Sequence, residues 1–291
     1  MDEIPESAFS LADNPLLIGY LLGVGIISLW CCATLLQRLS KPLNRASLVR
    51  SWQIGWIDFF LFLWIALCWI VLSQAMADLI PGMREARESA EATPIWVLLT
   101  TGLIMQGGLI LFFVVYRVFF WQLFQSPVNP RPHSYAAAFS TGLFHFLAFL
   151  PLVWLVGAAW TFLAFQLRDL GINIPIKPQD TVGFIQDSHN PWELLGMMFL
   201  AVVMAPIAEE LIFRAGIYRF LKSRWRGIFA MLISSAFFAL AHGHIFSFPS
   251  LLVVGIFLCL SYEWSGDIKV PIFFHGFFNL NSIVLILMQR G

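Results

Sequence analysis

The residues best suited to chemistry are ionisable groups that interrupt strongly apolar stretches in the last third of the chain. The first set lies in the segment AEELIFR, residues 208–214. Adjacent side chains on a helix point about 100° apart, so the two carboxylates of this segment cannot do the same job. Glu210 and Arg214 are four residues apart and can form an ion pair on one face. That pair leaves Glu209 free to act as a general base or acid.

Two histidine-containing sets follow. Residues 238–242 read FALAH, and residues 275–279 read HGFFN. His275 and Asn279 share one face of a helix, so they can donate two hydrogen bonds to a single oxygen, as an oxyanion hole requires. Each set also has a structural explanation when it is taken alone: an ion pair at the end of a span, a histidine bonded to a backbone carbonyl, or a polar pair that joins two helices.

Along the chain these sets read EExxxR, FxxxH and HxxxN. Together they resemble the CAAX protease and bacteriocin-processing (CPBP, or Abi) family of intramembrane endopeptidases, which includes the Ras- and a-factor-converting enzymes. The resemblance covers residues 191–288, and no element of the pattern is missing. The CAAX substrates of this family are prenylated proteins, which are cut near their C-termini.

The resemblance implies a role for each matching residue. Glu209 and His242 would activate a water molecule for attack on the scissile carbonyl. His275 and Asn279 would form the oxyanion hole. The Glu210–Arg214 pair would shape the site rather than take part in the chemistry.

A zinc site is the alternative arrangement, since family members have also been described as metalloproteases. Glu209, His242 and His275 would supply the His2Glu ligand set of a catalytic zinc. Using His275 as a ligand, however, would leave Asn279 alone in the oxyanion hole, and Glu210 would then have to polarise the bound water. The sequence also lacks the HExxH motif of common zinc peptidases. We therefore expect no metal cofactor, with Zn²⁺ as the alternative.

The composition places these residues in a membrane. Of the 291 residues, 59% are hydrophobic and only 12% are charged, and the mean hydropathy is +0.79. Such values exclude an ordinary soluble domain. The 17 basic and 17 acidic residues balance, so nothing favours a nucleic-acid partner. The expected partners are the lipid bilayer and a membrane-anchored or lipidated protein substrate.

The apolar stretches are continuous rather than alternating, which predicts an all-α, polytopic integral membrane protein. About eight transmembrane helices are expected, over residues 15–36, 54–73, 95–121, 138–165, 193–212, 228–246, 249–264 and 270–288. The proline-rich loop 122–133 suggests a division of the chain. We expect an N-terminal membrane region, 1–135, with three spans, and a protease core, 136–291, with five.

The distribution of basic residues predicts the orientation, because cytoplasmic loops are enriched in Lys and Arg. Most of the 17 basic residues fall in alternate loops if both termini are on the non-cytoplasmic side. This assignment places Arg214, Arg219 and Lys222 in a cytoplasmic loop. It also puts His242 and Glu209 at different depths, unless the fifth helix continues past Arg214 or the sixth is tilted.

The function that follows is an intramembrane endopeptidase that hydrolyses a peptide bond of a membrane-anchored or lipidated, CAAX-type protein. A transporter that relays protons or ions is an alternative, although no inverted repeat is visible. A non-catalytic membrane scaffold is another, although no motif residue is lost. Rhomboid and aspartyl intramembrane proteases fit poorly, because a GxSG loop and a GxGD motif are absent. The remaining ionisable residues of the apolar stretches are assigned no catalytic role: Asp58, His145 and His244.

Overall fold

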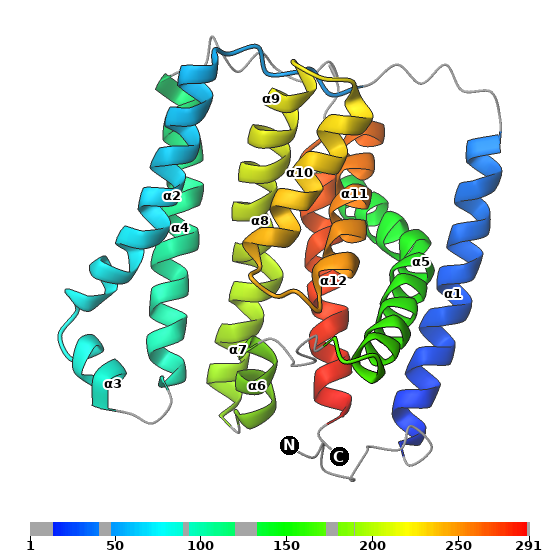
Figure 1. Ribbon diagram of the computed structural model, residues 1–291, viewed down its shortest axis with the longest axis horizontal. Coiled ribbons are helices and arrows are strands. Elements are labelled where there is room, and N and C mark those ends of the chain that lie inside the picture. The colour runs from blue at the N-terminus through cyan, green and yellow to red at the C-terminus, as the bar shows by residue number, and fades with distance from the viewer. Residues whose placement is uncertain are drawn as a thin grey trace.

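A computed structural model describes residues 14–40, 48–89, 93–119, 133–172, 180–188 and 190–289. The regular structure of these residues is entirely helical (Figure 1). In chain order the helices are α1 (Pro15–Ser40), α2 (Trp56–Asp78), α3 (Met83–Ser89), α4 (Ile95–Phe119), α5 (Tyr135–Asp169), α6 (Asp180–Asp187), α7 (Pro191–Phe199), the π-helix η2 (Leu200–Met204), α8 (Ala205–Glu209), the π-helix η3 (Glu210–Tyr218), α9 (Arg219–Lys222), α10 (Gly227–Ala241), α11 (Phe248–Ser265) and α12 (Lys269–Met288).

Within these described ranges, seven helices are long and apolar enough to cross a membrane, and α10 is a shorter apolar helix. The segments from α7 to α9 count as one of the seven, Pro191–Lys222, which we call the long helix. The predicted all-α, polytopic membrane protein is thereby confirmed. Residues 120–132 lie outside the described ranges, and with them most of the proline-rich loop. The division of the chain near residue 135 stays a prediction.

The long helix corrects the predicted fifth span. The sequence placed its end at residue 212 and assigned Arg214, Arg219 and Lys222 to a loop, but all three lie within the helix. The helix can continue because Arg214 is neutralised inside it by Glu210, four residues earlier. Glu209 therefore lies near the middle of the helix, about 20 Å from Lys222 at 1.5 Å per residue.

Helix α10 brings His242 to a similar depth. It begins at Gly227, just after the upper end of the long helix in Figure 1, and its 15 residues cover about 22 Å. This length is shorter than the hydrocarbon core, about 30 Å thick, so α10 ends inside the molecule. The chain then turns at Gly243, whose φ is +63°, and α11 returns toward the starting edge. The mismatch in depth between Glu209 and His242 is resolved by the continued fifth helix.

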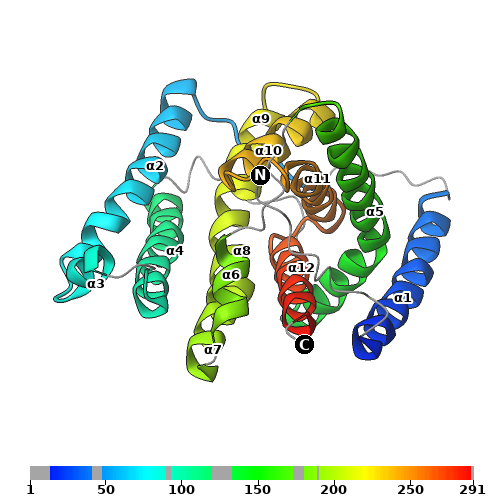
Figure 2. The same ribbon diagram turned by 60° about the horizontal axis from the view of Figure 1, so that its bottom comes forward.

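The helices form one row with the long helix near its centre. Both views place α2 and α4 on one side of the long helix, and α5 and α1 on the other (Figures 1 and 2). The elements α10, α11 and α12 lie between the long helix and α5. Consecutive helices α1 and α2 thus lie on opposite sides of the motif-bearing helices. The segment that leads into α2 passes the end of α9, where Trp52 N donates to Arg219 O over 2.8 Å.

The two ends of the described chain meet at the end of the helix bundle opposite α9 (Figure 1). Asn14 Nδ2 donates to the carbonyl of Met288 over 2.6 Å, and Tyr20 hydroxyl donates to Asn281 Oδ1 over 2.9 Å. The start of α1 and the end of α12 therefore lie side by side at one end of the helix bundle.

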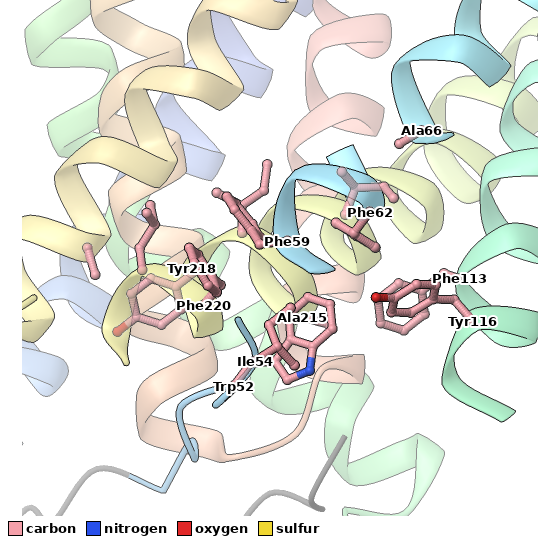
Figure 3. Packing of buried hydrophobic residues seen from close by; sticks show 14 of the residues in the cluster. Trp52, Ile54, Phe59, Phe62, Ala66, Phe113, Tyr116, Ala215, Tyr218 and Phe220 are labelled. Carbon is pink, nitrogen blue, oxygen red and sulfur yellow. The ribbon is translucent and has the colours of Figure 1, made fainter. Parts of the chain in front are cut away.

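An aromatic cluster fixes α2 to the upper part of the long helix (Figure 3). The rings of Phe59 and Phe220 stack with centroids 3.7 Å apart, and Phe62 meets the edge of Trp52 at 5.3 Å. Gly216 provides the space for Phe62, because a Cβ at this glycine would lie 2.8 Å from the ring. The cluster holds α2 and α4 firmly against the helix that carries Glu209.

Candidate active site

Three segments bring the predicted site residues together inside the molecule. Glu209 ends α8, at the junction between the two π-helical stretches of the long helix. His242 is the C-cap of α10, and both His275 and Asn279 lie on α12. π-helical insertions are rare and are frequent at functional sites, because they re-aim the side chains of a helix.

The carboxylate of Glu209 faces both histidines. Its Oε2 atom lies 3.9 Å from His242 Nε2 and 3.8 Å from His275 Nε2. These distances exceed a direct hydrogen bond, and Oε2 makes none with any described residue. The side chains of Glu209 and His242 are 28% and 24% exposed, whereas His275 is only 3% exposed. Glu209 and His242 are therefore the partly exposed members of the group, although Oε2 itself is buried, and His275 forms the buried wall.

His242 is oriented by its own helix. Its Nδ1 lies 2.8 Å from the carbonyl oxygen of Phe238, four residues earlier. A carbonyl can only accept, so Nδ1 carries a hydrogen and Nε2 is the nitrogen that faces Glu209. The backbone bond foreseen as a structural explanation of this histidine is therefore present, and it leaves Nε2 as the ring nitrogen that is directed at Glu209.

A buried ionic network supports the site. Arg214 NH1 donates to Glu210 Oε1 over 2.7 Å, and both side chains are fully buried. The same carboxylate oxygen accepts from His275 Nδ1 at 2.9 Å. Arg214 also approaches the carbonyl of Gly255 at 3.4 Å. The ion pair predicted from the i, i+4 spacing is present, and it extends to the ring of His275.

Asn279 makes a contact that its sequence spacing did not reveal. Its Nδ2 donates to the carbonyl oxygen of Ala201, in η2, over 2.7 Å. Helix α12 comes close enough for this bond because Gly276 faces the same stretch: a Cβ there would lie 2.7 Å from Val202 O. His275 and Asn279 thus share one face of α12, and Asn279 is anchored to the helix that carries Glu209.

Phe238 is a site residue to which the sequence assigned no role beyond its place in the motif. It is fully buried, and Arg214 Cζ lies 4.3 Å from its ring centroid. The rings of His242 and His275 meet it edge-on, at 4.7 Å and 5.6 Å. The phenyl ring therefore packs against both imidazoles and against the guanidinium of Arg214, and it fixes their positions. Its spacing of four residues before His242 was the available signal.

The other ionisable residues of the apolar stretches lie elsewhere and have structural partners. Asp58 Oδ2 accepts from Gly55 N at 3.2 Å and caps α2. His145 Nδ1 lies 2.7 Å from Ser261 Oγ, which joins α5 to α11. His244 Nδ1 lies 2.9 Å from Ser247 Oγ, in the turn before α11. None of the three is part of the Glu209 site.

The three candidate zinc ligands, Glu209, His242 and His275, lie farther apart than the ligands of a bound zinc ion. Zinc ligands at about 2.0–2.1 Å in tetrahedral geometry lie about 3.4 Å from one another, which is shorter than both glutamate–histidine distances here. In the described part of the chain, no group of three or more His, Cys, Asp or Glu side chains is placed to hold a metal. The metal-free mechanism stays a prediction, with Zn²⁺ as the alternative.

The fold and the site thus define a polytopic α-helical membrane protein with a buried glutamate–histidine centre, and comparisons with known proteins place it further. Residues 191–281 match the family model described as Rce1-like, type II CAAX prenyl endopeptidase Rce1-like. This match confirms the resemblance that the three motifs indicated, over the region that contains all of them.

Two curated proteins are similar to parts of the chain. The membrane-embedded CAAX protease MroQ of Staphylococcus aureus is 32% identical over 98 residues, which cover 32% of this chain and 40% of that protein. An uncharacterized protein of Mycoplasma capricolum subsp. capricolum is 25% identical over 121 residues, covering 40% of this chain and 33% of that protein. The chain therefore spans well under half the length of the curated relatives it matches. No solved structure matches it.

Proposed function

We propose that this protein is an intramembrane endopeptidase that hydrolyses a peptide bond of a membrane-anchored or lipidated protein. The observation that carries the proposal is the approach of His242 and His275 to one unbonded oxygen of Glu209 inside an apolar helix bundle. The match of residues 191–281 to CAAX prenyl endopeptidases supports a peptide substrate of the CAAX type.

In the proposed mechanism, Glu209 is the general base. Its free Oε2 takes a proton from water while His242 Nε2 accepts a second hydrogen bond from the same water. The hydroxide attacks the scissile carbonyl carbon, and the carbonyl π electrons move to its oxygen. When the C–N bond breaks, Glu209 returns the proton to the leaving amine. One water is consumed, and an acid and an amine are released.

His275 and Asn279 stabilise the oxyanion of the tetrahedral intermediate in this scheme. His275 Nδ1 is committed to Glu210, so donation to an oxyanion falls to Nε2 of the doubly protonated ring. The carboxylate of Glu210 forms ion pairs both with the positively charged ring of His275 and with Arg214. The amide of Asn279 supplies the second donor. Fixed donors in a water-poor site are worth far more than donors in water.

The orientation in the membrane is part of the proposal. Exposed basic residues gather at the ends of helices that lie opposite the Asn14–Met288 contact: Arg38, Arg117, Arg224 and Arg226. Their enrichment favours the cytoplasm for that side, and both termini would then be non-cytoplasmic. A C-terminal fusion to alkaline phosphatase should be active in cells, and a C-terminal fluorescent-protein fusion should be dark. The reverse pattern would refute the orientation.

The test of the activity uses a quenched fluorescent lipopeptide and detergent-purified protein. Glu209→Gln and Glu209→Ala should each lower kcat by at least about 10²-fold, the contribution of a general base. Glu88→Gln, at an exposed glutamate of α3, is the matched control and should retain full activity. Each protein is assayed with and without a strong chelator. Turnover that survives in both Glu209 variants would reject the base, and chelator-sensitive turnover restored by Zn²⁺ would reject the metal-free mechanism.

A further inference from the structure

We propose that Pro206 is a positioning residue of this site, because it leaves free the backbone carbonyl that orients Asn279. The inference rests on the proposed function, since it assigns a role within the same site. It begins with the hydrogen-bond ladder of η2. Ala205 N donates to Leu200 O, five residues earlier, as in a π-helix. The next rung of that ladder would join residue 206 to Ala201 O.

Proline cannot form that hydrogen bond. Pro206 has no N–H, so it can donate neither to Ala201 O in a π-helical pattern nor to Val202 O in an α-helical one. Both carbonyls that residue 206 could serve face α12. Ala201 O accepts from Asn279 Nδ2 at 2.7 Å, and Val202 O is the atom that a Cβ at Gly276 would meet at 2.7 Å.

The short segment α8 links Glu209, the proposed base, to Asn279 of the proposed oxyanion hole. Pro206 and Glu209 are both in the five-residue segment α8, and Asn279 is bonded to the residue that Pro206 leaves unpaired. The side-chain amide of asparagine has two hydrogens. When one is held by Ala201 O, the direction of the other is set relative to Glu209. Pro206 thereby fixes where an oxyanion can be held with respect to the attacking water.

Replacement by alanine tests this role without weakening the helix. Alanine at this position would supply the missing N–H and has a higher helix propensity, so Pro206→Ala should not lower the thermal midpoint. The regained N–H would compete for Ala201 O or Val202 O, and Asn279 would lose its anchor. We expect kcat to fall by about 10–100-fold with KM within about twofold, because a small misplacement of a donor costs rate rather than binding.

A double-mutant cycle separates this mechanism from a general structural effect. In the wild-type background Asn279→Ala should lower the thermal midpoint, because it leaves the carbonyl of Ala201 without a donor. In the Pro206→Ala background the same change should cost less, since the backbone N–H of the introduced alanine is available. The double variant should also be no slower than Asn279→Ala alone. Pro151, inside α5, is the matched control: Pro151→Ala and Asn279→Ala should be additive in both measurements.

The thermal midpoints test the link without a substrate, so the two proposals can fail separately. Additive effects of Pro206→Ala and Asn279→Ala on the midpoint would overturn the role of Pro206, whatever the peptidase assay shows. Coupled midpoints together with full activity in Pro206→Ala would overturn its role in the reaction. Coupled midpoints in a protein whose turnover survives Glu209→Gln would support the Pro206–Asn279 link and refute the proposed mechanism.

Discussion

Replacing Arg214 with methionine should be one of the most destabilising single changes in this protein. Methionine retains an unbranched apolar stem, so the substitution removes chiefly the charge and its hydrogen bonds. What remains is the carboxylate of Glu210, fully buried, with only His275 bonded to it. The main source of the expected cost is the loss of one partner of a buried ion pair, which takes the charged guanidinium donor away from the Glu210 carboxylate.

The contacts of Arg214 give the magnitude. The charged hydrogen bond to Glu210 at 2.7 Å is worth about 1.5–3 kcal/mol. The guanidinium over the ring of Phe238, at 4.3 Å, adds about 0.5–2 kcal/mol. The approach to Gly255 O at 3.4 Å is long and adds little. These contributions agree with the loss of about 3–5 kcal/mol expected when one partner of a buried ion pair is removed.

The assay is reversible unfolding in mixed micelles of increasing SDS content, followed by tryptophan fluorescence. Arg84→Met is the matched control, because Arg84 and Glu88 have the same i, i+4 spacing but are 73% and 66% exposed. The Arg84→Met variant should show no measurable loss in the free energy of unfolding. The double variant Glu210→Gln/Arg214→Met should recover much of the stability, since it removes both charges. An Arg214→Met protein within about 1 kcal/mol of wild type would refute the assignment of a buried, unscreened pair.

Three further outcomes follow from close contacts in the described residues. Gly276→Ala should lower kcat even in protein that is still fully folded at the assay temperature, because a Cβ 2.7 Å from Val202 O pushes α12 away from η2. Turnover and thermal unfolding measured on one sample check this. Phe59→Ala should cost about 3–5 kcal/mol in the SDS titration, because it removes the ring stacked on the aromatic cluster of Figure 3. His145→Phe should cost about 1–3 kcal/mol by leaving Ser261 Oγ without its partner, while specific activity of the folded fraction stays unchanged. Equal midpoints for wild type and Phe59→Ala, or lost activity in folded His145→Phe, would contradict the packing described.

Much of the site could be predicted because it depends on spacing within single helices. The Glu210–Arg214 pair needs only the i, i+4 geometry of a helix, and the structure has it at 2.7 Å. The shared face of His275 and Asn279 has the same origin. The membrane class followed from composition, because apolar runs of this length are stable as helices in a bilayer and in few other settings.

The prediction for the fifth span was wrong because it judged the charge of Arg214 and the length of the helix without the partners that folding brings. Counting residues ended the fifth span near 212, because an arginine inside a membrane is costly by itself. In the folded protein Glu210 neutralises Arg214, so the helix continues to Lys222. That extension is what places Glu209 at the depth of His242, a relation that no single span could reveal.

Sequence alone thus determined the chemical groups, their order and the faces on which they lie, since these depend on covalent spacing and helical periodicity. Tertiary structure decided which groups meet. His275 Nδ1 pairs with Glu210 rather than Glu209, and Asn279 pairs with a carbonyl 78 residues away. Both contacts depend on how α12 packs against the π-helical stretches of the long helix. That packing is set by side-chain volume and by the close approach at Gly276, which are properties of two helices together and of neither one alone.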